Sequence, residues 1–347
     1  MSYRPKLVAA TVVAVAGLAA AGCSSGSSSS SAPSSAAPAP GAPAGPGSAA
    51  DLSAVTLNVG DQKGTGAEAV LQAAGLLKTL PFKVNWSDFT SGPTMVQAMS
   101  TGAVDIGGVG DAPPVFAASG GENIEIVGAR ETPGGDADAI VVPKNSPIHS
   151  IAQLKGKKIA VSFGSSDDYE LLTVLTKNGL TTKDVTLVNL QPAPGLAAFT
   201  SGAIDAWDIW PPYVQQLQGQ YGGRVIATGK PYGSPYSFEV ASKSAVGNPA
   251  KAAAIKVYLA TLDKAYRWTD THQSAWAAVW GQATGLPASI MEQAAKVEIN
   301  VPAHISNAVV SSEQGLVAQF YAAGLIPGKV DMSKFITSAF NDTVSGG

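Results

Sequence analysis

The sequence predicts an α/β fold arranged as two lobes, and three observations indicate this class. Short runs rich in β-branched residues alternate with longer amphipathic runs, a pattern typical of a sheet covered by helices. A second series of such units begins near Ser150. The C-terminal part of the chain is instead a succession of helical patterns, which we expect to complete the first lobe.

The strands and helices of the first lobe are predicted from the order of the β-branched and amphipathic segments. We expect strands over residues 55–59, 83–89, 104–109 and 124–127, and helices over residues 66–77, 93–99 and 113–118. Gly60 and the Ser91-Gly92-Pro93 turn punctuate the ends of strands. Each expected strand therefore directs its carboxyl end at a loop.

The second series repeats this organisation. Strands are expected over residues 158–161, 185–190, 204–207 and 225–227, with helices over residues 150–154, 167–177, 195–200 and 211–218. Extended stretches over residues 139–142 and 237–241 bracket the series, so the chain is expected to cross between lobes there. The resulting domain boundaries are 54–142 and 238–347 for the first lobe, and 143–237 for the second.

The C-terminal helices begin with a recognisable cap. Asn248 precedes Pro249, which suits the first position of a helix. An apolar stripe on one face then follows, made by Ile255, Leu259, Leu262 and Tyr266. Further helices are expected over residues 273–282, 287–297, 311–322 and 333–340.

The first 22 residues have the pattern of an export signal. Arg4 and Lys6 precede an apolar run that ends at Ala20, and small residues lead to Cys23. The run is shorter than the roughly 18 residues that cross a bilayer, so we expect removal of residues 1–22. Cys23 is the single cysteine, placed where a lipoprotein carries its lipid, and it predicts an extracytoplasmic protein anchored to the cell membrane. The alternative is ordinary secretion, because lipoprotein signals more often have Leu at the position of Ala20.

Residues 23–53 are predicted to be a tether. From Ser24 to Ala50 every residue is Ser, Ala, Gly or Pro, which gives too little apolar surface to offset the entropy of ordering. A flexible chain of this length spans roughly 30 Å. A structured Pro-rich recognition arm is the alternative.

Charge and residue counts exclude several classes of function. The leader contains Arg4, Lys6 and no acid, so 20 basic and 25 acidic residues remain, a net charge of −5. No basic cluster indicates a nucleic acid partner. His149, His272 and His304 lack ligand spacing, so no metal or cofactor is expected. We expect a monomer.

Three motifs stand out in the first lobe, Gln62-Lys63-Gly64, Ser91-Gly92-Pro93 and the Gly-rich run over residues 107–114. They resemble motifs of the aliphatic sulfonate-binding proteins of ABC importers. In the second lobe, the motifs over residues 159–166, 169–172, 188–192 and 204–207, with Trp210 and Pro211, are similar to the taurine-binding branch. The resemblance implies a two-lobed type-II periplasmic-binding-protein fold with two hinge crossovers and the ligand between the lobes. It also implies a membrane permease and an ATPase as partners, and no catalysis.

A sulfonate stays anionic, so its site must supply hydrogen-bond donors. Helix N-termini do so with free backbone N–H groups and a favourable dipole. Candidates at the expected strand-to-helix turns are Gln62, Lys63, Gly64, Ser91, Gly92, Gly110, Asp111, Ser165 and Ser166. Small residues at such turns are commonly only caps. For Ser165 and Ser166 the family's ligand-binding turn favours contact with the ligand, whereas Asp111 remains open between an N-cap and a ligand contact.

Taurine also carries an ammonium group, which would require a carboxylate and aromatic walls. Candidate carboxylates are Asp168, Asp208 and Glu239, and candidate walls are Trp207, Trp210 and Tyr236. Packing between lobes is the alternative for the two tryptophans, and a favourable charge in the first helical turn is preferred for Asp168. Arg130 could pair with the anion, although a surface or hinge position is favoured for it.

Two other functions remain open from the sequence. Binding proteins for nitrate or bicarbonate share the fold, and fold alone does not select a ligand. A desulfinase also uses the fold, but that resemblance implies a cysteine nucleophile, and Cys23 lies in the export signal.

Overall fold

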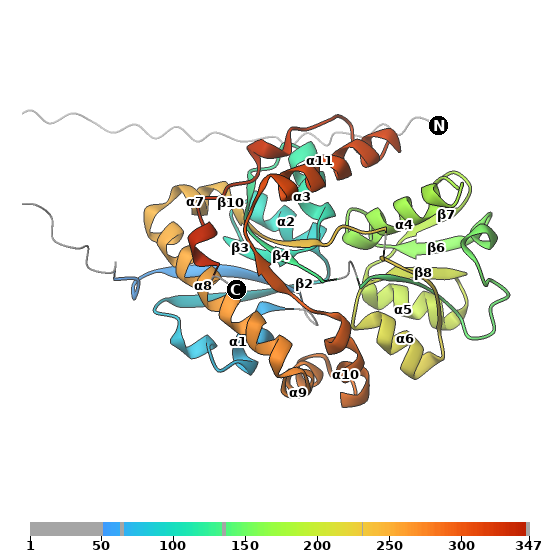
Figure 1. The fold of residues 1–347 in the computed structure, drawn as a ribbon, viewed down its shortest axis with the longest axis horizontal. Helices are drawn as coiled ribbons and strands as arrows, with labels where there is room; N and C mark the ends of the chain where they lie inside the picture. Colours follow the sequence, from blue (N-terminus) through green and yellow to red (C-terminus); the bar gives the residue numbers. More distant parts are fainter. Residues whose placement is uncertain (1–50, 63–65, 134–136, 231, 345–347) are drawn as a thin grey trace, which may run out of the picture. The chain divides into compact units, whose positions relative to one another are not determined.

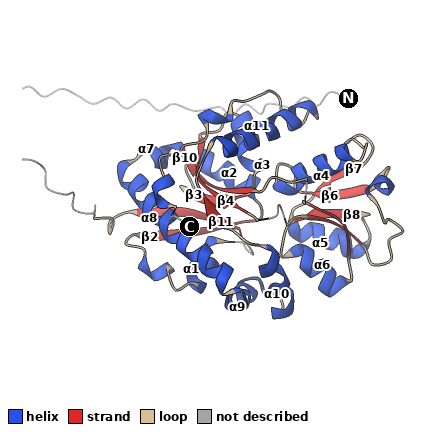
Figure 2. Ribbon diagram, in the orientation of Figure 1, coloured by secondary structure: helices blue, strands red, loops and turns tan. Residues whose placement is uncertain are grey.

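The computed structural model describes residues 51–62, 66–133, 137–230 and 232–344 (Figure 1). Two separate sheets organise this part of the chain, one of six strands and one of five, each with helices packed on it (Figure 2). We call the six-stranded sheet and its helices lobe 1, and the five-stranded sheet and its helices lobe 2. Lys63, Gly64 and Cys23 lie outside the described residues.

Lobe 1 has the strand order β11-β4-β10-β3-β1-β2. Its strands are β1 (Thr56–Gln62), β2 (Lys83–Phe89), β3 (Ile106–Val109), β4 (Ile124–Glu131), β10 (Tyr236–Ser242) and β11 (Val301–Ala303). Strand β1 pairs parallel with β2 and β3, whereas β10 pairs antiparallel with both β3 and β4. The parallel strands place their carboxyl ends at one edge of the sheet.

Lobe 2 has the strand order β7-β6-β8-β5-β9. Its strands are β5 (Ala139–Val142), β6 (Lys158–Val161), β7 (Thr186–Asn189), β8 (Ala206–Ile209) and β9 (Arg224–Thr228). Strand β6 pairs parallel with β7 and β8, and β5 pairs antiparallel with β8 and β9. Each sheet thus contains one interior strand that runs opposite to its other interior strands, β10 in lobe 1 and β5 in lobe 2, and lobe 1 adds the antiparallel edge strand β11.

The chain passes from lobe 1 to lobe 2 earlier than the sequence indicated. We expected residues 139–142 in the first lobe, but β5 is entirely part of the lobe 2 sheet. The crossing lies between the end of β4 at Glu131 and Ala139, and the return lies between Thr228 and Tyr236. The two crossing segments are joined by a hydrogen bond from the Thr132 N–H to the Pro235 carbonyl, 2.8 Å long.

Helices cover both faces of the lobe 1 sheet. One buried cluster joins the sheet to α1 (Ala67–Ala73), α8 (Pro249–Thr271), α9 (Gln273–Thr284) and α10 (Ala288–Val297). A second cluster joins it to α2 (Gly92–Ser100), α3 (Ala112–Ser119) and α11 (Asn307–Ala322). The short α7 (Lys243–Gly247) precedes α8. None of the helices in the described ranges is both long and apolar enough to span a membrane.

Lobe 2 has three α-helices among its described residues, α4 (Ser166–Lys177), α5 (Pro192–Ser201) and α6 (Tyr213–Tyr221). Its core is formed by two smaller clusters of buried side chains. Helix α4 also contributes to the other lobe, because Tyr169 and Leu172 belong to a buried cluster of lobe 1. The Gln319 side chain of α11 bonds both the Tyr169 hydroxyl, at 2.9 Å, and the Thr173 hydroxyl, at 3.1 Å. The lobes therefore share a packed contact through α4 and α11.

Most of the expected C-terminal elements are present. Asn248 caps α8 by accepting hydrogen bonds from the N–H groups of Ala250 and Lys251, and its predicted apolar stripe is buried. The prediction of a helix over residues 333–340 was wrong. That segment forms a 3₁₀ turn at Met332–Lys334 and then pairs with strand β4 through an Ile126 to Ile336 bridge. The open edge of β4 beside Ile126 accounts for the extended conformation, because pairing satisfies its backbone groups.

Candidate ligand-binding cleft

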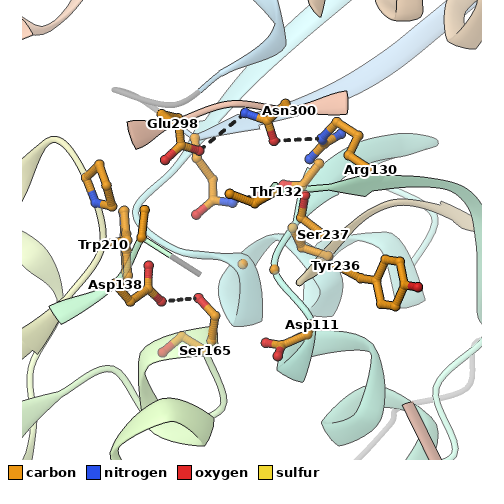
Figure 3. Close-up of a pocket in the computed structure, with 18 of the residues that line it drawn as sticks. Asp111, Arg130, Thr132, Asp138, Ser165, Trp210, Tyr236, Ser237, Glu298 and Asn300 are labelled. Atoms are coloured by element: carbon orange, nitrogen blue, oxygen red, sulfur yellow. Dashed lines mark hydrogen bonds between the residues drawn. The ribbon is translucent and has the colours of Figure 1, made fainter. Parts of the chain in front are cut away.

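A cavity of about 120 Å³ lies between the two lobes (Figure 3). At roughly 10–15 Å³ per water molecule, this space holds on the order of ten water-sized groups, which suits a small molecule. Lobe 1 contributes Asp61, Gln62, Gly92, Gly108, Gly110, Asp111, Arg130, Thr132, Tyr236, Ser237, Tyr266, Glu298 and Asn300. From the lobe 2 side come Asp138, Ser165, Ser166, Trp210 and Pro211.

Besides α1, whose start is described below, three helices begin at this cavity, each after the carboxyl end of a parallel strand. Helix α2 follows β2, α3 follows β3 and α4 follows β6. Their first residues lie beside Gly92, Gly110 and Ser165, all in the cavity wall. The N–H groups of a first helical turn have no partner within the helix, so these starts can donate to an anion.

Two glycines allow the close approach of these helix starts. A Cβ atom added at Gly92 would lie 2.8 Å from Cγ of Pro113 in α3. One added at Gly110 would lie 2.9 Å from Cβ of Ser166, across the gap between the lobes. Both distances are too short for a real side chain, so glycine is required for the observed packing.

The serine turn of lobe 2 uses its hydroxyl groups within the protein. The Ser165 hydroxyl bonds the Ser162 carbonyl and the Asp167 carboxyl group, and the Ser166 hydroxyl donates to Oδ2 of Asp138 at 2.8 Å. Both hydroxyl groups are therefore engaged before any ligand arrives. The donors left for a ligand at this turn are backbone N–H groups.

Two buried carboxyl groups lie directly under this turn. Asp167 accepts from the Ser162 N–H at 3.3 Å, and Asp168 accepts from the Gly164 N–H at 2.9 Å. Burial raises the pKa of Asp168 to about 6, and it raises the pKa of Asp167 well above the ordinary value. Asp168 thus bonds to the backbone of its own turn and is not among the residues that line the cavity.

Asp61 fixes the start of α1 beside the cavity. Its carboxyl group accepts hydrogen bonds from the N–H groups of Gln62, Ala67 and Glu68, at 3.0, 2.8 and 3.2 Å. Burial nevertheless raises the pKa of Asp61 to about 7. The side-chain amide of Gln62 donates to the Gly108 carbonyl at 3.0 Å, so Gln62 is also held in place.

A set of charged and amide side chains forms the far wall of the cavity in lobe 1. Arg130 pairs with Glu239, and the two side chains are only 10% and 4% exposed. The Arg130 guanidinium also lies 4.7 Å from the centre of the Tyr266 ring, and its Nε donates to Oδ1 of Asn300 at 3.3 Å. The Asn300 amide in turn donates to Glu298 at 3.5 Å. Arg130 was expected at the surface or hinge, but it is a buried part of the cavity wall.

The positions of the predicted residues divide into two groups. Those that border the cavity are Gln62, Gly92, Gly110, Asp111, Ser165, Ser166 and Trp210. Ser91 is fully buried at the N-cap of α2, and its hydroxyl has no hydrogen-bond partner among the described residues.

The structure places Trp207, Asp208 and Glu239 outside the cavity. Trp207 is fully buried in lobe 2 and packs against Phe199 and Tyr213, with ring centres 6.4 and 6.0 Å away. Strand β8 runs to Ile209, two residues beyond its expected end, so Trp210 rather than Asp208 is the first residue past the strand. Packing within the lobe, not contact with a ligand, therefore accounts for Trp207.

Sequence reasoning missed Asp61, Asp138, Thr132, Tyr266, Glu298 and Asn300 in the cavity wall. Asp61 carries a usable signal, since it lies at the end of the first strand, just before the Gln62-Lys63-Gly64 motif. Tyr266 was predicted only as part of the apolar stripe of α8, and the other four lie in segments that no motif singled out. Within the described residues, no group of three or more His, Cys, Asp or Glu side chains is arranged to hold a metal ion.

Comparison with known proteins identifies the family. A profile of the NMT1/THI5-like family matches residues 84–254. Over 293 residues, the chain is 36% identical to a protein of Escherichia coli (strain K12) named as an aliphatic sulfonates-binding protein, covering 83% of this chain and 90% of that protein. The chain therefore belongs to the NMT1/THI5-like family, among the aliphatic sulfonate-binding proteins.

Two further similarities concern the fold and the second branch of the family. The alkanesulfonate-binding protein SsuA from Xanthomonas axonopodis pv. citri, solved with bound MOPS, superposes with a TM-score of 0.76 at 31% identity. The superposition covers 82% of this chain and 99% of that one. The taurine-binding periplasmic protein of Escherichia coli (strain K12) is 37% identical over 150 residues, covering 43% of this chain and 45% of that protein.

These relatives confirm the expected two-lobed type-II periplasmic-binding-protein fold. They are binding proteins by name, and the protein is accordingly a solute-binding protein rather than an enzyme. Such binding proteins act with a membrane permease and its ATPase.

Proposed function

We propose that this protein is an extracytoplasmic lipoprotein that captures a small sulfonate, taurine or an alkyl sulfonate, for import by an ABC permease and its ATPase. The observation that carries the proposal is the meeting of three helix starts from both lobes at one small cavity. Each first turn offers backbone N–H donors and the positive end of a dipole, worth roughly 0.3–1 kcal/mol for a nearby anion. A sulfonate needs such donors and no proton.

The relatives support a sulfonate as the anion. The named substrates of the Escherichia coli relatives are aliphatic sulfonates and taurine, and MOPS in the Xanthomonas structure is itself a sulfonate. Nitrate or bicarbonate would fill less of the cavity. We also propose that residues 1–22 are removed, that Cys23 carries the lipid and that the protein acts as a monomer. The tether, predicted over residues 23–53, must end before Leu52, because Leu52 is buried in the core of lobe 1.

A thermal-shift screen tests the sulfonate assignment. We would use the purified chain from Cys23 onward with Cys23→Ser, so that no lipid is attached. A ligand at a hundredfold its Kd adds about 2.7 kcal/mol of stability, which raises the melting temperature. Taurine or a short alkyl sulfonate should produce this shift and nitrate should not. A shift with nitrate alone would refute the assignment, whereas incorporation of labelled fatty acid that is lost in Cys23→Ala would support the anchor.

A further inference from the structure

The far wall of the cavity is built to contact something polar. Figure 3 shows Arg130, Glu298 and Asn300 on one side of the cavity, with Asp111, Asp138 and Ser165 on the opposite side. A small ligand held by its anionic end near the helix starts therefore presents its other end to this wall. Nothing in the chemistry of a plain alkyl chain matches these side chains.

The wall is fixed rather than mobile. Arg130 is 8% exposed and is held by Glu239, by the Tyr266 ring and by Asn300. An alkyl tail laid against these groups would remove them from water without replacing the hydrogen bonds, which costs free energy. The arrangement therefore disfavours an unsubstituted tail.

The net charge of this wall favours a cationic group of the ligand over an anionic one. The positive charge of Arg130 is balanced by Glu239, and Glu298 lies close enough to Arg130 to affect its pKa. One positive group thus faces two carboxylates. Asp111 and Asp138 lie on the opposite side of the cavity, by the helix starts, so they add no charge to this wall. A second anionic group on the ligand would meet an acidic surface, whereas a cationic group would be attracted to it.

We propose that this wall selects a short sulfonate bearing an ammonium group at its far end, with Glu298 and Asn300 contacting that group and Arg130 positioning Asn300. The inference rests on the proposed sulfonate function and narrows it. Trp210 also borders the cavity, and an aromatic ring beside a cation adds to its binding. Unsubstituted alkanesulfonates are therefore poorer ligands of this chain.

A panel of sulfonates with equal carbon chains tests the proposal. The four compounds are ethanesulfonate, 2-hydroxyethanesulfonate, 2-aminoethanesulfonate and sulfoacetate, titrated by calorimetry into the same Cys23→Ser chain. We expect the amino compound to bind at least about tenfold more tightly than ethanesulfonate, a difference of about 1.4 kcal/mol. Sulfoacetate should bind most weakly.

The variant Glu298→Gln removes one charge while keeping the shape of the side chain. It should bring the affinities of the amino and unsubstituted compounds to within about threefold of each other. Glu292→Gln, at an exposed position of α10, is the matched control and should retain the full preference. Melting temperatures report whether each variant is folded.

The possible results separate this inference from the proposed function. Equal or tighter binding of ethanesulfonate by the unaltered chain overturns the inference and keeps the sulfonate function. A preference for the amino compound that survives in Glu298→Gln overturns the role of this wall. Absence of binding by all four compounds overturns the proposed function itself.

Discussion

The helix starts of α2 and α4 border the same cavity but differ in chemistry. At α2, the N-cap Ser91 is fully buried with a hydroxyl that has no partner among the described residues, and the first turn contains no acid. At α4, the Ser165 hydroxyl is bonded, and Asp167 and Asp168 lie buried in the first turn. These two carboxyl groups already interact with the positive end of the α4 dipole. A serine at a helix start is therefore not by itself an anion site, and the α2 start is the more available one.

The largest effect should come from filling the α2 start. Gly92→Val would place a branched side chain where even a Cβ lies 2.8 Å from Pro113 and 3.3 Å from Val109. The added methyl groups should displace the start of α2 from the cavity and weaken ligand binding by about 10- to 100-fold, a loss of about 1.4–2.8 kcal/mol. Gly315→Val in α11 is the control, because a Cβ there meets nothing within 4 Å. Calorimetry that finds unchanged affinity in Gly92→Val would show that the anion does not lie at this helix start.

The acidic start of α4 should make the stability of the ligand-free protein depend on pH. Burial raises the pKa of Asp168 from 3.8 to about 6, so the folded state binds a proton more tightly than the unfolded state. The resulting stability is fully present below about pH 4 and is lost as the pH rises through about 6, on the order of 1–3 kcal/mol. Thermal melts should therefore show a melting temperature several degrees higher at pH 5 than at pH 8.

The variant Asp168→Asn isolates this contribution. An amide has no charge to lose, so the decline in melting temperature between pH 5 and pH 8 should become shallower. Some decline should persist, because burial also raises the pKa of Asp167 and Glu313. A decline as steep as that of the unaltered chain would exclude Asp168 as its source.

The smallest effect sharpens the comparison between the two N-cap serines. Ser91→Ala should weaken ligand binding by about 2- to 10-fold, because one neutral hydrogen bond contributes roughly 0.5–1.5 kcal/mol. Ser165→Ala should leave the affinity within about twofold while lowering the melting temperature, since its bonds are internal. If calorimetry instead finds a larger loss of affinity in Ser165→Ala than in Ser91→Ala, the anion binds at the α4 turn.

The architecture was largely predictable from local pattern. Residues 83–89 and 158–161 form strands with the expected bounds, and Asn248 caps α8 as expected. These features depend on neighbours in sequence. The segment over residues 333–340 was not predictable in this way, because its conformation depends on the open edge of β4 at Ile126, far away in sequence.

The site was predictable only where its residues lie at strand-to-helix turns. Gly92, Gly110 and Ser165 follow strands directly, and parallel strands bring their carboxyl ends to one edge. The far wall could not be found, since Arg130 and Asn300 come together only through the pairing of β4 with β11 and the packing of the C-terminal helices. A two-residue error in the end of β8 was enough to misplace Asp208.

The antiparallel strand in each sheet determines the order in which the lobes can be completed. Lobe 2 takes all its strands from one continuous stretch, between Ala139 and Thr228. Lobe 1 needs β10 between β3 and β4, so its sheet stays divided until residue 242 is available. During synthesis or export, the N-terminal strands therefore emerge first yet finish folding last, with edges exposed to wrong pairing in the interval. Sequence changes in β10 should for this reason reduce the yield of folded protein more than changes of similar size in lobe 2.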